Sequence, residues 1–502
     1  MARVWAQAVS SKRCAAWAKP LPVELGQSGE ADVVLQPPKS SSSAGSSLAL
    51  HDLQLSQLDP SEFTPLTDPV VVFQMDLACK EAPIPLTEQK VTTSPAIASG
   101  SCDAIFMWWD CWTDPDCSVL LSCAPSFATH HPDKHKIPWR DHWMQAIYYP
   151  QSSTIAQQGE PLSLVACHDE YSMWFDVLLE RPEAPLPMPH PQPGLQMAMS
   201  RYHTHFLKLA LVPIVYQLLC YMYMYYHNLW KSLRHKDCRS RLGQINCASR
   251  NSLFASALSK TIRKHRKIND MDQREYCTIL CLGEQSLLGL MAAKLGADKV
   301  IICCEENKYM RDYLLDCARQ NDIADKVELV SSSWLSSSPL PPLSAVIAEP
   351  HFTTALLPWH NLHIWFLLNS INLPPSTTIM PSKCRLYLVP MHFDDLWKIR
   401  APLKSIEGFS MDHFDQIIHD ASSNADQAVE PQPLWEYPGT AMSEPVEVVE
   451  FDITKPVPGE KMSYKGTVGL DSKLPLCGVA LWVDWQLDEK TNVSSGPRAK
   501  VN

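Results

Sequence analysis

The apolar and polar positions along the chain follow two different periods. Short runs that alternate apolar and polar residues, among them RVWAQAV, PVVVFQMDLA and LSLVACHDEYSMWFDVLL, fill residues 1–185. Successive side chains of a β-strand point to opposite faces, so a period of two predicts an antiparallel sheet or barrel. After residue 384 the chain returns to runs of the same kind, such as CRLYLVPMHF and GVALWVDWQL.

The stretch between these two regions has another pattern. From residue 246 to 383, helix-like segments such as SRNSLFASALSKTIRKHR alternate with short, continuous apolar runs such as TILCLG, KVIICCEE and LSAVIAEP. That alternation predicts a parallel sheet covered by helices. The sequence therefore predicts an α/β domain at 246–383 between two β-barrel regions, 1–185 and 384–502, with 186–245 as an insertion and linker.

Residues 205–230 (HFLKLALVPIVYQLLCYMYMYYHNLW) form the longest apolar run of the chain. The run reaches the roughly 18 residues that a membrane span needs, but Pro213 and Gln217 interrupt it. A single span there would place the two flanking halves on opposite sides of a bilayer. We therefore expect an insertion at a domain boundary and no membrane span; a membrane-tethered form is the remote alternative.

The two strand-rich regions resemble each other. RVWAQAV, which contains Arg3, is similar to RLYLVPM, which begins at Arg385, and FMWWDCWTD at Phe106 is similar to ALWVDWQLD at Ala480. The two motifs recur in the same order, which predicts an internal duplication. The first region continues to PWRDHWMQAIYY, whereas the second ends before any counterpart. We therefore expect the second barrel to be truncated.

Charge and cysteine content narrow the classes of function. The chain has 502 residues and a formal net charge of −11, which disfavours direct nucleic-acid binding because phosphate contacts need clustered Lys and Arg. An acidic surface suits a basic, Arg-rich protein partner instead. The 17 cysteines are scattered through apolar runs, as expected of free thiols in a reducing compartment. They form no pair of CxxC motifs, so their spacing predicts no metal site.

Residues 279–307 (ILCLGEQSLLGLMAAKLGADKVIICCEEN) have the layout of a nucleotide-binding strand–loop–helix–strand unit. Gly283 is the first loop residue, and Glu305 ends the next strand, where a ribose-binding acid belongs. The positions after the glycine are Glu284 and Gln285, whose side chains would crowd a cofactor. We expect a degenerate site, and favour a βαβ unit that serves packing rather than binding.

Three long stretches resemble one family. PWRDHWMQAIYYPQ at 138–151, EPHFTTALLPWHNLHIWF at 349–366 and PLWEYPGTAMSEP at 433–445 are similar to segments of the protein arginine N-methyltransferases with two tandem modules. The resemblance implies that each module has an S-adenosylmethionine-binding α/β domain followed by a β-barrel. It also implies that the first module is catalytic and that the second is a divergent copy packed on it as a pseudo-dimer. Residues 246–383 would then be the methyltransferase-like domain of the second module.

The resemblance also implies roles for individual residues. The family holds the substrate guanidinium with two Glu residues on one hairpin; here only Glu349 stands there, and the next acid is Asp394, so Glu349 is interpreted as a relic. His142 and Trp143 match a family loop that lines the guanidinium pocket. The α/β domain of the first module would precede Arg3, so we expect a form shortened at its N-terminus, with Trp143 exposed on the rim of the barrel.

The family reaction is monomethyl transfer from S-adenosyl-L-methionine to the arginine guanidinium of basic proteins such as histones and spliceosomal Sm proteins, in the cytoplasm and nucleus. We expect this chain alone neither to bind the cofactor nor to be active. The alternative is a non-catalytic scaffold or regulatory isoform that binds partner proteins through the second module. The zinc-binding cysteines that the family has between its modules are not matched cleanly, and Cys238 is the one candidate.

Overall fold

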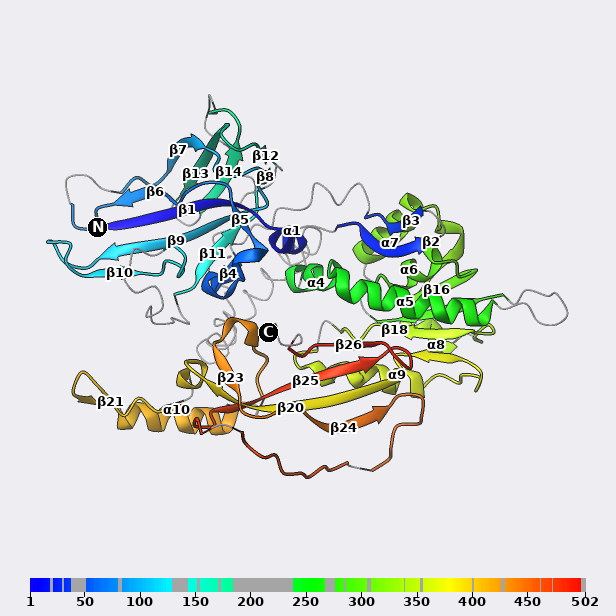
Figure 1. Cartoon of the computed structure of the whole chain (residues 1–502). Coiled ribbons are helices and arrows are strands. Elements are labelled where there is room, and N and C mark those ends of the chain that lie inside the picture. Colours follow the sequence, from blue (N-terminus) through cyan, green and yellow to red (C-terminus); the bar gives the residue numbers. More distant parts are fainter. Residues whose placement is uncertain are drawn as a thin grey trace, which may run out of the picture. The chain divides into compact units, whose positions relative to one another are not determined.

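The computed structural model describes residues 1–18, 21–28, 31–37, 51–79, 84–128, 143–150, 154–169, 173–182, 184, 238–266, 276–283, 286–304, 308–337, 339–352, 355–399, 401–425, 429–460, 462–471 and 473–497. The chain divides into two compact units (Figure 1). The first contains residues 1–21 and 39–246, and the second contains residues 22–38 and 247–502.

The main sheet of the first unit is built around β1 (Ala2–Ser10), which pairs antiparallel with β9 (Ala104–Trp112). Among the described residues the sheet has seven strands in the order β4-β11-β9-β1-β5, with β6 also beside β1 and β10 also beside β9. The other strands are β4 (His51–Leu53), β5 (Thr64–Pro65), β6 (Val70–Met75), β10 (Leu120–Ser122) and β11 (Gln145–Tyr148).

Two smaller sheets complete the first unit. One has the order β14 (Met173–Leu178), β13 (Pro161–His168), β7 (Glu88–Pro95), and the other pairs β12 (Ile155–Ala156) with β8 (Gly100–Ser101). One apolar core joins the sheets and includes Phe73, Ile105, Leu164 and Phe175. Short helices flank them: α1 (Lys12–Ala18), η2 (Leu55–Gln57), η3 (Pro60–Glu62) and α4 (Cys238–Ile245).

The second unit contains the predicted parallel sheet, which is confirmed. In the described part of the chain its order is β17 (Val327–Val330), β16 (Lys299–Cys303), β15 (Thr278–Leu282), β18 (Ala345–Ala348), β19 (Thr378–Met380), and every pair is parallel. The helices are α5 (Ala248–His265), α6 (Leu288–Lys294), α7 (Lys308–Gln320), η5 (Ala324–Lys326), α8 (Ser332–Ser337), η6 (Pro358–Leu362) and α9 (His363–Asn369).

A second antiparallel sheet follows the parallel one along the chain. The long strand β20 (Lys383–Phe393) pairs on one side with β25 (Gly478–Gln486) and on the other with β24 (Val446–Asp452) and β23 (Gly439–Ala441), and β26 (Asn492–Ser494) pairs with β25. One buried core joins the two sheets, with Leu282 and Val346 from the parallel sheet and Val483 and Trp485 from the antiparallel one. The remaining elements are η7 (Leu396–Ile399), β21 (Ser405–Ile406), β22 (Phe409–Ser410), α10 (Asp412–Ala425) and η8 (Leu434–Glu436).

Among the described residues the strand-rich regions are half-barrels, where the sequence predicts β-barrels and a truncated second one. Among the described strands, the hydrogen-bonded order of the first unit's main sheet ends at β4 and β5 without returning on itself. That of the second unit's antiparallel sheet ends likewise at β23 and β26. The inward face of each curled sheet buries its apolar residues in a core that it shares with a neighbouring sheet.

The two half-barrels repeat the same pairing. The cross-strand partners lie at matching positions in the two sheets: Arg3 with Asp110 and Trp5 with Trp108 in the first, Arg385 with Asp484 and Tyr387 with Trp482 in the second. The register also shifts at matching positions, between Val4 and Trp5 against β6 and between Leu386 and Tyr387 against β24. A register shift of this kind is a fixed local feature of a strand pair.

One hairpin from the predicted first region belongs to the second unit. The strands β2 (Val23–Ser28) and β3 (Ala31–Leu35) pack on the α/β domain. Just after α7, the Asn321 side chain donates from Nδ2 to the Gln36 carbonyl at 2.7 Å and accepts at Oδ1 from the Gln36 amide at 2.8 Å. The boundaries drawn from the sequence, with 1–185 as one region, do not anticipate this placement.

The apolar run at 205–230 lies outside the described residues. Within the part of the chain that the structure does describe, no helix is long and apolar enough to cross a bilayer.

Candidate functional site

The carboxyl ends of β15 and β18 meet at Gly283 and Glu349. β15 is buried along its length and ends at Gly283, whose φ is +110°, a conformation that suits glycine. A Cβ at Gly283 would lie 2.9 Å from the Glu349 carbonyl oxygen. The Glu349 amide donates to the Leu282 carbonyl at 3.2 Å. Gly283 therefore allows a close approach between two segments of this chain.

The Glu349 side chain is held by an arginine of the same chain. Glu349 is 2% exposed, and its Oε1 accepts a hydrogen bond from Nη2 of Arg250 in an ion pair. Arg250 is in the first turn of α5, and its guanidinium carbon lies 4.7 Å from the centroid of the Phe254 ring. Its Nη1 also donates to Oδ1 of Asn251 at 3.3 Å. The buried carboxylate is thus already bonded to a guanidinium group.

The loop after Gly283 turns its described residues toward the domain core. Ser286 is buried, and its Oγ accepts a hydrogen bond from the Leu288 amide at 3.2 Å. The Cys281 thiol lies 3.9 Å from the same Oγ, and burial raises the pKa of Cys281 to about 12. A neutral thiol and a hydroxyl engaged with the loop backbone present no charge to a ligand.

The other predicted site residues are only partly described. Glu284, Gln285, Glu305 and His142 lie outside the described residues, so their predicted roles stay predictions. Trp143 is described, and the expectation that it is exposed to solvent is wrong.

Trp143 is half-buried beside the first unit's core. Its ring lies 5.3 Å from that of Trp109 in an edge-to-face arrangement. This geometry is favoured between aromatic rings and removes apolar surface from water.

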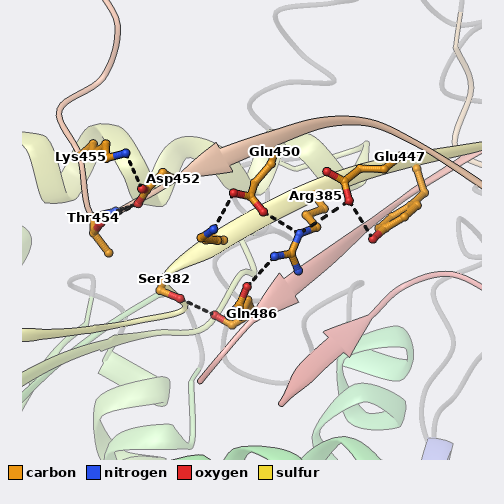
Figure 2. A network of polar contacts seen from close by, with 10 residues as sticks. Ser382, Arg385, Glu447, Glu450, Asp452, Thr454, Lys455 and Gln486 are labelled. Carbon is orange, nitrogen blue, oxygen red and sulfur yellow. Dashed lines mark hydrogen bonds and ion pairs between the residues drawn. The ribbon is translucent and has the colours of Figure 1, made fainter. Parts of the chain in front are cut away.

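A polar network covers part of the second half-barrel (Figure 2). Arg385 donates from Nε to Glu450 at 2.8 Å and from Nη2 to Gln486 at 2.7 Å, and Lys383 donates to Glu450 at 2.6 Å. The hydrogen bond from Lys383 and the contacts with Arg385 lower the pKa of Glu450 against the opposing effect of burial. Arg385 and Lys383 are both paired within the sheet, so this network joins β20, β24 and β25 and is no candidate active site.

Sequence reasoning missed Arg250. Arg250 and Phe254 are four residues apart and therefore share one face of α5, which is a local signal for their contact. The partner Glu349 is 99 residues away in sequence, and no spacing rule connects the two. Among the described residues, no group of three His, Cys, Asp or Glu side chains could hold a metal ion. The side chain of Cys238 lies outside that description.

Comparison with known proteins gives the family. The family model described as the arginine methyltransferase oligomerization subdomain matches residues 2–179. The chain is 36% identical over 519 residues to protein arginine N-methyltransferase 7 of Drosophila melanogaster and 37% identical over 528 residues to that of Drosophila yakuba. Each match covers 100% of this chain and 67% of the relative. The chain belongs to the protein arginine methyltransferase family.

Solved structures of arginine methyltransferases are more distant. A protein arginine methyltransferase 10 of Arabidopsis thaliana is 17% identical with a TM-score of 0.35, covering 50% of this chain and 76% of that one. A Trypanosoma brucei PRMT1 enzyme–prozyme heterotetrameric complex with AdoHcy is 13% identical with a TM-score of 0.34, covering 48% and 73%. The family assignment rests on the curated relatives, and with it the resemblance drawn from the sequence is confirmed.

Proposed function

We propose that this chain takes part in S-adenosylmethionine-dependent monomethylation of arginine in basic proteins such as histones and Sm proteins, and that its described α/β domain is not the catalytic one. The observation that carries the second half is the ion pair between Arg250 and the buried Glu349. A carboxylate that must hold a substrate guanidinium needs oxygen atoms directed at the substrate. The Glu349 carboxylate is directed at the chain's own arginine.

A substrate arginine that displaced Arg250 from Glu349 would have to offset the free energy lost when the ion pair breaks. Breaking a buried ion pair by removing one partner costs about 3–5 kcal/mol, because the other charge is left uncompensated. An incoming arginine would have to replace Arg250 at Glu349 without a second acid, since the sequence offers none before Asp394. On this proposal the α/β domain supports a methyltransferase assembly by packing rather than by chemistry.

The test is calorimetric titration of the chain with S-adenosylmethionine, together with a methyl-transfer assay on an Arg-rich histone peptide. We expect no saturable binding and no labelled peptide from the chain alone. Saturable binding that is lost on changing Gly283→Val, and kept on changing the exposed Gly459→Ala, would place a working cofactor site in this domain and contradict the proposal. Gly459 is a suitable control because no atom lies within 4 Å of an added Cβ.

The scaffold role is favoured by a separate observation on α10. This helix and the preceding strand β22 expose large apolar side chains: Phe409 is 74% exposed, Ile417 53% and Phe414 47%. This segment comes after β20 in the second half-barrel, just as the docked hairpin β2–β3 comes after β1 in the first. β1 and β20 occupy matching positions, because their cross-strand partners in β9 and β25 correspond. We propose that the half-barrels arose by duplication, and that α10 covers an α/β domain of another methyltransferase module as β2–β3 covers α5 to α7.

An association measurement tests the proposal for α10. Ile417→Asp places a charge in the exposed apolar face. We expect a smaller fraction of this variant to sediment in a complex with a methyltransferase module that contains a complete α/β domain. Asp420→Lys, on the same helix, changes charge without removing apolar surface and serves as the control. Equal association of the Ile417 variant and the parent chain would contradict the proposed docking.

A further inference from the structure

We propose that Cys477, His392 and Asp394 form a covalent modification site in the second half-barrel, at which the Cys477 thiol adds to apolar α,β-unsaturated carbonyl compounds. The thiol sulfur lies 3.3 Å from Nδ1 of His392, and Nε2 of the same ring lies 3.7 Å from Oδ1 of Asp394. The site goes beyond the proposed function and uses none of its residues, so either can fail without the other.

The register of the sheet brings the thiol and the imidazole together. Gly478, the first residue of β25, pairs with Met391 of β20, and the Cys477 amide donates to the Met391 carbonyl at 3.1 Å. One position further along, Cys477 stands opposite His392, and opposite side chains of an antiparallel pair are close enough to interact. His392 also pairs with Thr440 of β23, so its backbone is held on the other side. The two residues are 85 positions apart in sequence.

The surroundings of the imidazole suit a base that takes up the thiol proton. The Pro475 carbonyl oxygen lies 2.9 Å from Nδ1 of His392 and 3.3 Å from the Cys477 sulfur, so it can accept a hydrogen bond from whichever of the two holds the proton. Once the proton is on Nδ1, Nδ1 donates to Pro475 and Nε2 faces the Asp394 carboxylate. A nucleophile beside a base that a third group orients is the arrangement of an activated thiol.

Accessibility distinguishes Cys477 from the other cysteine of residues 384–502. Cys384 is buried in β20, and burial raises its pKa to about 12, which keeps this thiol protonated and unreactive. Cys477 is half-buried. Val479, two positions along the strand and therefore on the same face, is 50% exposed, and the adjacent Leu476 is 54% exposed. Exposed apolar side chains beside the thiol favour an apolar electrophile over a charged one.

The reaction is an addition that needs no further reactant. The Cys477 sulfur forms a bond to the β-carbon of the electrophile, and the carbon–carbon double bond breaks as its electrons move toward the carbonyl oxygen. Nδ1 of His392 takes the thiol proton and returns it to the α-carbon. The product is a thioether, and His392 ends in its starting state. Oxidation by a peroxide is less well supported, because the one other cysteine of this half-barrel, Cys384, is buried and offers no accessible second thiol.

Alkylation rates of individual cysteines test the proposal. The full chain is treated with cyclohexenone at one fixed pH, and adducts are counted at each cysteine by proteolysis and mass spectrometry. Cys117 is the internal reference, because it is exposed and its thiol contacts the Pro115 carbonyl at 4.0 Å. A positioned base contributes about 100-fold or more, so Cys477 should react about 100-fold faster than Cys117. In urea the two rates should become equal.

A second electrophile tests the assigned chemical class. Acrylamide carries the same reactive double bond on a polar group, so the advantage of Cys477 over Cys117 should be smaller with acrylamide than with cyclohexenone. An equal advantage with both reagents would overturn the preference for an apolar compound. A Cys477 that is oxidised by hydrogen peroxide but not alkylated by cyclohexenone would overturn it as well. Equal rates at the two cysteines in the folded chain would overturn the site itself.

Variants of the imidazole and the carboxylate test their roles. His392→Gln should lower the rate at Cys477 to that at Cys117, whereas loss of a histidine that only packs the strand end would uncover the thiol and raise the rate. Asp394→Asn keeps the base and should lower the rate less, because the Asp394 side chain is 58% exposed. His413→Gln, at an exposed position of α10, is the matched control and should leave the rate unchanged.

An unchanged or higher rate at Cys477 in His392→Gln would overturn the proposal. If that variant does not fold, the parent chain still decides the question, because its ratio of the Cys477 rate to the Cys117 rate is compared in the folded state and in urea. A ratio that is the same in both states would show that the fold does not activate Cys477, and the proposal would fail.

Discussion

Replacing Asn321 with alanine should loosen the β2–β3 hairpin from the α/β domain. Asn321 is 3% exposed and bonds both the amide and the carbonyl of Gln36, the residue that follows β3, at 2.8 and 2.7 Å. With these two hydrogen bonds, one side-chain amide just after α7 pairs with both backbone groups of a residue 285 positions away in sequence. In the variant both bonds are lost together.

The magnitude follows from the surroundings of Gln36. A typical hydrogen bond contributes about 0.5–1.5 kcal/mol net, and the penalty is larger when the abandoned partner is buried. Gln36 is exposed, so water can replace the lost bonds, and we expect a cost of about 1–3 kcal/mol. Leu35 and Val23 of the hairpin remain buried, each contributing about 1.5–3 kcal/mol of apolar burial, so the hairpin stays docked but opens more often.

Hydrogen–deuterium exchange measures this opening. A cost of about 1–3 kcal/mol corresponds to about 5- to 150-fold faster exchange of the hairpin amides, while amides of the buried strand β15 should exchange as before. Gln320→Ala changes the exposed neighbouring residue and should leave exchange within the range of a surface substitution. Unchanged exchange over 23–35 in the Asn321 variant would refute the reasoning, as would an equal acceleration in β15.

Three further predictions concern packing and charge. Gly289→Ala should destabilise the chain by about 1–3 kcal/mol in urea unfolding, although alanine normally favours a helix, because the new Cβ would lie 2.6 Å from Cγ1 of Ile302. Burial opposes ionisation of Asp488, but its hydrogen bonds, chiefly from Lys260, lower its pKa from 3.8 to about 2. The stability that ionised Asp488 contributes is therefore present above its ordinary pKa and lost as the pH falls toward about 2. In Asp488→Asn, the melting temperature should therefore fall less steeply over this acidic range than in the parent chain. Trp143→Ala should cost about 1–3 kcal/mol in thermal unfolding, between an exposed and a fully buried residue, because the ring is half-buried.

Each of these has an outcome that would contradict it. Gly459→Ala, at an open position, is the control for Gly289, and equal stability of the two variants would mean that α6 moves away from β16 to make room. If the melting temperature of Asp488→Asn falls with acidic pH as steeply as that of the parent chain, the contact with Lys260 at 2.8 Å does not persist in solution. A cost below about 0.5 kcal/mol for Trp143→Ala would restore its exposed position on the rim.

The sequence predicts those parts of the fold that local periodicity determines. β15, β16 and β18 are continuous apolar runs because both faces of a parallel sheet are covered, and these runs are visible without any knowledge of their partners. The repeated motifs at Arg3 and Arg385 indicate that the two strand-rich regions are alike, although they do not show which strands pair. Periodicity does not show whether a curled sheet closes, since closure depends on its edge strands, and the predicted barrels are half-barrels among the described residues.

Contacts between distant segments could not be predicted. The hairpin at 23–35 alternates apolar and polar residues like its neighbours, so nothing in its own sequence indicates that it docks on α7 through Asn321. The same holds for the candidate site. Gly283 and Glu349 are recognisable by type and position, but the ion-pair partner of Glu349 is Arg250, on a helix that precedes the whole parallel sheet.

On the proposed function, the ion pair also explains how a carboxylate suited to catalysis can be retained in a domain that does not use it. Deleting the charge of Glu349 alone would leave Arg250 partly buried without its counter-ion, and deleting Arg250 alone would leave a buried anion; either change costs about 3–5 kcal/mol. Only their joint replacement by apolar residues of similar volume could be neutral. On this estimate, folding alone favours keeping Glu349 whether or not a substrate ever reaches it. A glutamate at this position of an α/β domain is thus no sign of activity until its partner is known.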